Sequence, residues 1–115
     1  MRLRVASWNI RGAAHPALQL ALLARCHPDI VLLQDVSRSA AQAIRTSGCL
    51  GTAIDTWSGP DAEPGTRPRI GCLMTAPHGW RLSRDDQPGV TGRLLCGTAA
   101  YEHTQLTLFS CYAPT

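Results

Sequence analysis

The sequence contains no lysine, and all eleven of its basic residues are arginine. The formal net charge at pH 7 is only +3. Arginine presents a planar fork of donors that matches the oxygens of a phosphate group. This composition therefore favours a phosphate-bearing partner, although a GC-rich coding sequence, which favours arginine and alanine codons, explains the same bias.

No apolar stretch in the sequence is long enough to cross a bilayer. The most apolar helical run, residues 17–24, is far shorter than the roughly 20 residues that a membrane-spanning helix needs. The two arginines near the N-terminus are not followed by a continuous apolar segment, so no signal peptide is predicted. We therefore expect no contact with a membrane.

Cysteine pairs of the Cys-x-x-Cys type are also absent. The five cysteines are odd in number and widely spaced, which argues against a disulfide framework and a zinc site. They are Cys26, Cys49, Cys72, Cys96 and Cys111, and most of them lie inside apolar runs. This usage predicts buried, reduced thiols in an intracellular protein of the cytoplasm or nucleus.

A chain of 115 residues with 44% hydrophobic residues is long enough for one domain with a core and too short for two. We find no internal repeat, low-complexity tract or domain boundary. Residues 1–115 are therefore treated as one unit.

The first 33 residues predict a strand, a helix and a second strand. Residues 3–8 alternate and are followed by the turn former Gly12, which is typical of a strand. Residues 15–26 show helical spacing. Residues 30–33 are apolar without alternation, as expected of a strand covered on both faces, and the short connection implies a right-handed parallel crossover.

A second helix is predicted for residues 36–47, with Val36, Ala40 and Ile44 on one face and Gly48 at its C-terminal end. Further strands are predicted for residues 50–57, 70–75, 92–99 and 106–112. Residues 58–69 are expected to form a surface loop, and residues 78–90 are polar and irregular. This order predicts an α/β fold.

Two polar side chains follow the first two strands at their carboxyl ends. Asn9 follows the first strand and Asp35 follows the second. Ligands of open α/β sheets collect at the carboxyl ends of strands, and neighbouring parallel strands end side by side. We therefore expect Asn9 and Asp35 to form half of a reaction centre.

Five segments in order resemble the N-terminal half of the endonuclease/exonuclease/phosphatase superfamily, which includes exonuclease III and deoxyribonuclease I. They are Ser7-Trp8-Asn9-Ile10-Arg11-Gly12, residues 28–35 ending in Gln34-Asp35, Ile70-Gly71, Gly92-Arg93 and Tyr112-Ala113-Pro114-Thr115. The amino-acid sequences of the first and last segments are most similar to those of retroelement endonuclease domains. The resemblance implies half of a four-layer α/β sandwich, with one mixed sheet carrying helices on its outer face.

The sequence departs from the superfamily pattern in two ways. Gln34-Asp35 stands where the superfamily has Gln-Glu, which shortens the reach of the carboxylate by one methylene. The Gly-Asp-x-Asn and Ser-Asp-His motifs are absent. We therefore expect residues 1–115 to be inactive alone, and to associate with a missing C-terminal half or with a second copy through an exposed sheet face.

The resemblance implies hydrolysis of a phosphoester assisted by Mg²⁺ or Mn²⁺. It makes Asp35 a metal ligand, makes Asn9 the residue that orients that ligand or a metal-bound water, and places the Tyr112 hydroxyl on a phosphate oxygen. Each has a structural alternative: Asp35 as the N-cap of the next helix, Asn9 as a turn former, and Tyr112 as an aromatic residue at the core edge.

Four arginines are candidates for phosphate contacts, because basic side chains supply most nonspecific affinity for DNA. They are Arg11, Arg67, Arg69 and Arg93. Taken singly, each is better explained as a scattered surface arginine.

The function predicted from the sequence is the N-terminal part of a metal-dependent phosphodiesterase, most similar to a DNA endonuclease. A non-catalytic module of the same fold that binds nucleic acid or a partner is the first alternative. A phosphatase acting on inositol phosphates or lipids is another, and a generic α/β domain with chance motif matches is the last.

Overall fold

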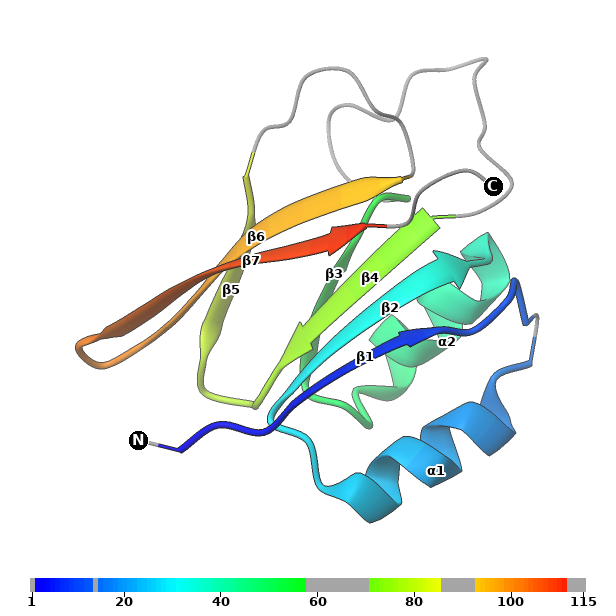
Figure 1. Ribbon diagram of the computed structural model, residues 1–115, viewed down its shortest axis with the longest axis horizontal. Coiled ribbons are helices and arrows are strands. Elements are labelled where there is room, and N and C mark those ends of the chain that lie inside the picture. Colours follow the sequence, from blue (N-terminus) through cyan, green and yellow to red (C-terminus); the bar gives the residue numbers. More distant parts are fainter. Residues whose placement is uncertain (1, 14, 58–70, 86–92, 112–115) are drawn as a thin grey trace.

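The computed structural model describes residues 2–13, 15–57, 71–85 and 93–111, which form two helices and seven strands (Figure 1). These elements are β1 (Val5–Asn9), α1 (Ala17–Cys26), β2 (Ile30–Val36), α2 (Arg38–Ser47), β3 (Thr52–Asp55), β4 (Gly71–Ala76), β5 (Arg81–Arg84), β6 (Leu94–Tyr101) and β7 (Thr104–Cys111). The strands form one sheet with the order β1-β2-β4-β3 and a second sheet with the order β5-β6-β7.

The predicted crossover from β1 through α1 to β2 is confirmed. β1 and β2 pair in parallel, from Val5 opposite Ile30 to Asn9 opposite Gln34. β4 pairs with β2 in the antiparallel sense, so the sheet is mixed. The carboxyl ends of β1 and β2 therefore lie at the same edge.

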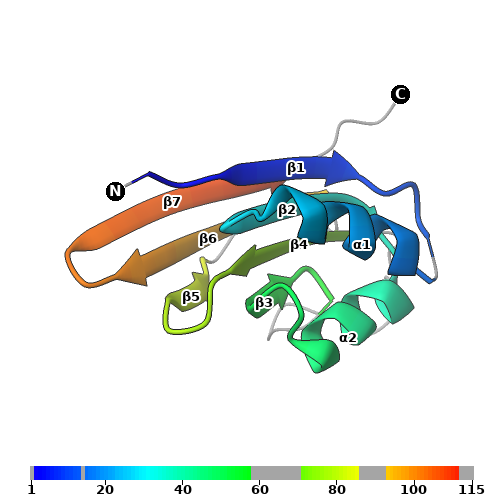
Figure 2. The same ribbon diagram turned by 90° about the horizontal axis from the view of Figure 1, so that it is seen from below.

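Alternation along β2 divides its side chains between two faces. Val31 and Leu33 pack in one buried cluster with Ile44 of α2. Ile30 and Leu32 point the other way, toward residues of the second sheet. Figure 2 shows the resulting layers, with the helices on one side of the four-stranded sheet and β5–β7 on the other.

The two sheets approach each other closely at Gly97 of β6. A Cβ atom placed on Gly97 would lie 2.8 Å from Ile54 Cδ1 and 2.8 Å from Met74 Sδ. Real Cβ atoms essentially never make contacts this short, so only glycine fits without displacing its neighbours. All six residues of β4 are buried between the helices and the second sheet.

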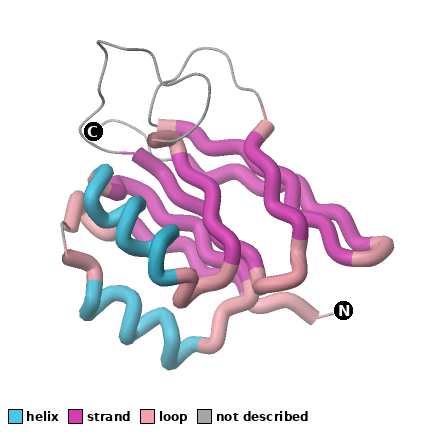
Figure 3. The backbone as a smooth tube through the Cα atoms, turned by 180° about the vertical axis from the view of Figure 1, so that it is seen from behind, coloured by secondary structure: helices cyan, strands magenta, loops and turns pink. Residues whose placement is uncertain are grey.

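The predicted class, a partial α/β sandwich with helices on the outer face of a mixed sheet, is confirmed. The sequence did not predict the second sheet, which covers the inner face of the first (Figure 3). Residues 78–90 were predicted to be irregular, and this is wrong for β5. Arg81 and Ser83 of β5 are exposed while Leu82 packs inward, so a short polar edge strand carries little sequence signal.

The predicted start of the second helix at Val36 is also wrong. Val36 is the last residue of β2, and α2 begins at Arg38 after the N-cap Ser37. Val36, Ala40 and Ile44 do share one buried cluster. Val36 therefore has the spacing of a helix residue relative to Ala40 and Ile44, although it is part of the strand.

The structure addresses both the membrane-spanning potential of the helices and the burial of the cysteines. Among the described residues no helix has the length and apolar character needed to span a membrane. Cys72 and Cys96 are buried as predicted, but Cys26, Cys49 and Cys111 are exposed. Cys111 shows the reason, because it lies in an apolar strand whose alternation turns it outward.

Candidate metal and phosphate site

A tight turn after β1 orients the side chain of Asn9. The backbone N–H of Ala13 donates to the carbonyl of Ile10 at 3.2 Å, and the two central residues, Arg11 and Gly12, have φ angles of 55° and 67°. Both values are typical of a type I′ turn. Asn9 Oδ1 accepts a hydrogen bond from the Arg11 N–H at 2.9 Å, so the predicted turn-forming role of Asn9 is present in the structure.

A β-bulge at the end of β2 turns the half-buried Asp35 out of the core. Leu33 pairs with Leu73 and Val36 pairs with Gly71, so β2 contains one residue more than β4 over this interval. Val36 occupies the helix-facing core position that regular alternation would give to Asp35. Asp35 instead has a φ of 53°, a left-handed conformation that costs a residue other than glycine roughly 1–2 kcal/mol.

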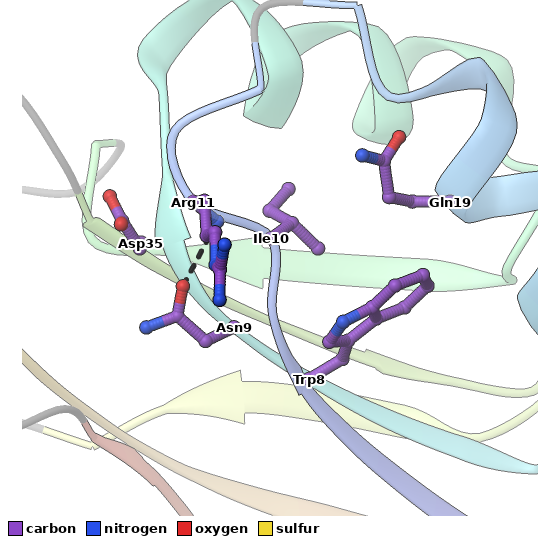
Figure 4. A pocket seen from close by; sticks show the side chains of 6 residues that line it. All are labelled: Trp8, Asn9, Ile10, Arg11, Gln19 and Asp35. Atoms are coloured by element: carbon purple, nitrogen blue, oxygen red, sulfur yellow. Dashed lines mark hydrogen bonds between the residues drawn. The ribbon is translucent and has the colours of Figure 1, made fainter.

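Backbone hydrogen bonds join the turn and the bulge. Ile10 N–H donates to the Gln34 carbonyl at 3.0 Å, and Gly12 N–H donates to the Asp35 carbonyl at 2.6 Å. A pocket of about 660 Å³ lies over this junction, lined by Trp8, Asn9, Ile10, Arg11, Gln19 and Asp35. Figure 4 shows Asn9, Arg11 and Asp35 at one end of the pocket and Trp8, Ile10 and Gln19 at the other.

The donor set of this pocket fits a hard cation that keeps most of its waters. The Asp35 carboxylate has no hydrogen bond or ion pair within the described residues, and Asn9 Oδ1 keeps a second lone pair. Mg²⁺ is commonly held by one or two carboxylates plus water and substrate oxygens. No cluster of three histidine, cysteine or acidic side chains suited to a metal occurs in the described part of the chain, so these two oxygens alone would bind weakly.

Arg11 adds positive charge beside the two oxygen donors. Its side chain is exposed and lines the same pocket. A guanidinium at this position suits the oxygens of a phosphate group that approaches Asp35.

Of the other predicted site residues, only Arg93 lies within the described part of the chain. Arg93 precedes β6 and does not line the pocket, while Tyr112, Arg67 and Arg69 lie outside the described residues. The alternative reading of Asp35 as a helix cap is wrong. Ser37 is the N-cap of α2, since its Oγ accepts a hydrogen bond from the Ala40 N–H at 3.2 Å.

Gln19 and Trp8 line the pocket and were not predicted as site residues. The Gln19 Oε1 atom is buried and has no hydrogen-bond partner among the residues that the structure describes. Gln19 lies within the first turn of α1, where nothing in the sequence separates it from an ordinary helix residue. Trp8 was noted only as part of the motif.

Comparison with known proteins identifies the fold. No protein-family model and no curated protein matches the chain. The crystal structure of truncated Caenorhabditis elegans TDP2 superimposes with a TM-score of 0.69 at 17% sequence identity, covering 98% of this chain and 47% of that one. The chain has the fold of the matched half of TDP2. A humanized D. rerio TDP2 with 14 mutations gives a TM-score of 0.63 at 17% identity, over 93% of this chain and 48% of that one.

The chain therefore spans about half the length of both TDP2 structures. At this identity the likeness establishes the fold. It agrees with the superfamily resemblance of the sequence motifs, and it does not single out the exonuclease III, deoxyribonuclease I or retroelement branches.

Proposed function

We propose that residues 1–115 form the N-terminal part of a metal-dependent phosphodiesterase that acts on DNA. TDP2 (tyrosyl-DNA phosphodiesterase 2) is a metal-dependent DNA phosphodiesterase of the endonuclease/exonuclease/phosphatase superfamily, and this chain shares the fold of half of it. The observation that carries the proposal is the position of Asn9 and Asp35 in one pocket, delivered by the parallel strands β1 and β2.

In this proposal Asp35 and Asn9 supply oxygen ligands and Arg11 binds a non-bridging oxygen of the phosphate. When bound, Mg²⁺ or Mn²⁺ polarises the phosphoryl oxygen and stabilises the leaving group. The sequence lacks the motifs that carry the superfamily's general base, and loss of such a group costs orders of magnitude in rate. We therefore expect these residues to bind the metal and the phosphate without hydrolysing the ester.

A non-catalytic module that binds nucleic acid is the second candidate. It is favoured by the single carboxylate among the described residues that line the pocket. In that case Arg11 would strengthen DNA binding while Asp35 would weaken it, because a carboxylate without a cation repels phosphate.

Isothermal titration of the protein with Mn²⁺ tests the proposal through Asp35→Asn. This change removes the charge and keeps the shape of the side chain, and it should weaken Mn²⁺ binding at least tenfold. The matched control is Asp29→Asn, which removes one carboxylate charge just before the other end of β2. The amide oxygen can still accept the hydrogen bond that Arg4 N–H now donates to Asp29, so binding should not change.

Equal Mn²⁺ affinities for the wild type and Asp35→Asn would remove Asp35 from the site. Titration with a short DNA duplex then separates the two candidates. Weaker DNA binding by Arg11→Gln, together with no Mn²⁺ binding by the wild type, would support the non-catalytic module.

A further inference from the structure

Around the bulge, four successive carbonyls of β2 accept hydrogen bonds from other parts of the chain. The Gln34 and Asp35 carbonyls accept from Ile10 and Gly12 N–H groups. The Leu33 carbonyl accepts from Ser110 Oγ at 3.1 Å, and the Val36 carbonyl accepts from the indole Nε1–H of Trp57 at 3.2 Å. Two of these donors are backbone N–H groups of the turn after β1, and two are side chains of other elements, Ser110 and Trp57.

The Gln34 side chain connects this bulge to the second sheet. Its Nε2 lies 3.0 Å from Ser110 Oγ of β7, 3.1 Å from Ser7 Oγ of β1 and 3.1 Å from the Leu32 carbonyl. Gln34 is only 8% exposed and Ser110 is 1% exposed. One buried amide therefore ties three strands together at the residue next to Asp35.

The free energies of these buried hydrogen bonds are large enough to stabilise the bulged conformation of β2. A buried polar group that loses its partner costs about 1–3 kcal/mol, which is comparable to the roughly 1–2 kcal/mol strain of a left-handed non-glycine residue. Gln34 contacts the second sheet while Val36 packs on the helix side, although regular alternation puts residues two apart on the same face. Both residues can keep their contacts only with the bulge between them. The hydrogen bonds of Gln34 and Ser110 thus offset the strain at Asp35.

We propose that Gln34 and Ser110 are positioning residues that hold the β2 bulge and so aim the Asp35 carboxylate into the pocket. The inference rests on the proposed function for the role of Asp35, and it assigns the second sheet a part in forming the metal site. Ser110 is 75 residues from Asp35 in the sequence, so only the packing of β7 against β2 brings the two together.

The test uses two changes with different risks to folding. Gln34→Leu keeps the side-chain size and removes the amide, while Ser110→Ala removes one hydroxyl. Ser110→Thr retains the hydroxyl and is the rescue variant. The matched control is Thr75→Val in β4, which removes another fully buried hydroxyl. Within the described part of the chain this hydroxyl has no hydrogen-bond partner.

Two readouts separate the local geometry from the metal site. In the metal-free protein, the coupling between the Asp35 amide proton and Hα and the Asp35 Cα shift report its left-handed φ by NMR. Mn²⁺ affinity by calorimetry reports the site. We expect Gln34→Leu and Ser110→Ala to abolish the left-handed signature and to weaken Mn²⁺ binding by about 10- to 100-fold, as for other groups that orient metal ligands. Ser110→Thr and Thr75→Val should leave both unchanged.

Retention of the left-handed signature in both Gln34→Leu and Ser110→Ala would overturn the inference. Loss of the signature with unchanged Mn²⁺ affinity would also overturn it, because aiming Asp35 would then have no consequence. If Gln34→Leu does not fold, Ser110→Ala and its threonine rescue decide the question. A wild-type protein that binds no Mn²⁺ would refute the proposed function, and the NMR readout would still show whether Gln34 and Ser110 hold the bulge.

Discussion

At the scale of single residues, the side chains of Asn9 and Asp35 differ in their contacts. Asn9 stabilises the turn after β1 through the Arg11 N–H, and its remaining lone pair is the one available to a cation. The Asp35 carboxylate has no hydrogen bond within the described residues, and the Asp35 backbone has a strained, left-handed conformation. Strain at a polar residue that lines a pocket is a reason to propose function there.

Cys72 provides a residue-scale prediction about pH. Burial raises the pKa of the Cys72 thiol from 9.0 to about 11. Between these two values the thiol is ionised in the unfolded chain but still protonated in the folded protein. Its contribution to the free energy of unfolding is therefore complete below about pH 9 and is lost as the pH rises toward about 11. Urea unfolding at several pH values should show this fall in the free energy of unfolding, and Cys72→Ala should lack that part of the slope.

The same burial makes Cys72 unreactive. At about pH 8 the exposed cysteines Cys26, Cys49 and Cys111 should react with iodoacetamide much faster than Cys72, because the thiolate is the nucleophile. Peptide mass spectrometry after a short exposure measures this order. Modification of Cys72 as fast as Cys49 would contradict the buried position of β4.

At the scale of elements, the sequence predicted the parallel pair β1 and β2 and their polar ends correctly. Continuous apolar residues in β2 and a helix-length connection were sufficient for this. The bulge was not predictable, because a strand with no alternation, such as Ile30–Leu33, gives no signal when one residue is added. β5 was missed for a related reason, since it is a short edge strand with polar residues outward.

The start of α2 gives a prediction at the element scale. Ser37→Ala removes the bond that Ser37 Oγ accepts from Ala40 N–H and the one it donates to the Ala13 carbonyl. Loss of an N-cap typically costs about 1 kcal/mol. Urea denaturation should show this loss for Ser37→Ala and none for Thr46→Ala, an exposed change on the same helix. If Asp35→Asn lowered the free energy of unfolding more than Ser37→Ala, the assignment of Ser37 as the N-cap of α2 would be wrong.

At the scale of the whole molecule, the second sheet changes which surface is exposed. The inner face of the first sheet is covered by β5–β7, and the outward face of β7 carries Phe109 at 57% exposure. The edge strand β1 exposes Val5 at 52%. Exposed apolar residues on a sheet face and an unprotected edge strand favour association.

We therefore expect the protein to self-associate through the outward face of β7. Light scattering after size-exclusion chromatography should show a mass above 12.4 kDa that rises with concentration. Phe109→Ser should lower this mass toward that of a monomer. Leu18→Ser, a change to an exposed residue of α1, should have no effect. A wild-type protein that remains monomeric at high concentration would contradict this expectation.

The central claim is that the ends of β1 and β2 together form a cation site, and paramagnetic broadening by Mn²⁺ tests it most directly. Substoichiometric Mn²⁺ should broaden the NMR signals of Asn9, Arg11 and Asp35 first, and excess Mg²⁺ should restore them. Broadening centred elsewhere in the described chain, or broadening at Asn9 and Asp35 that persists in Asp35→Asn, would contradict the claim.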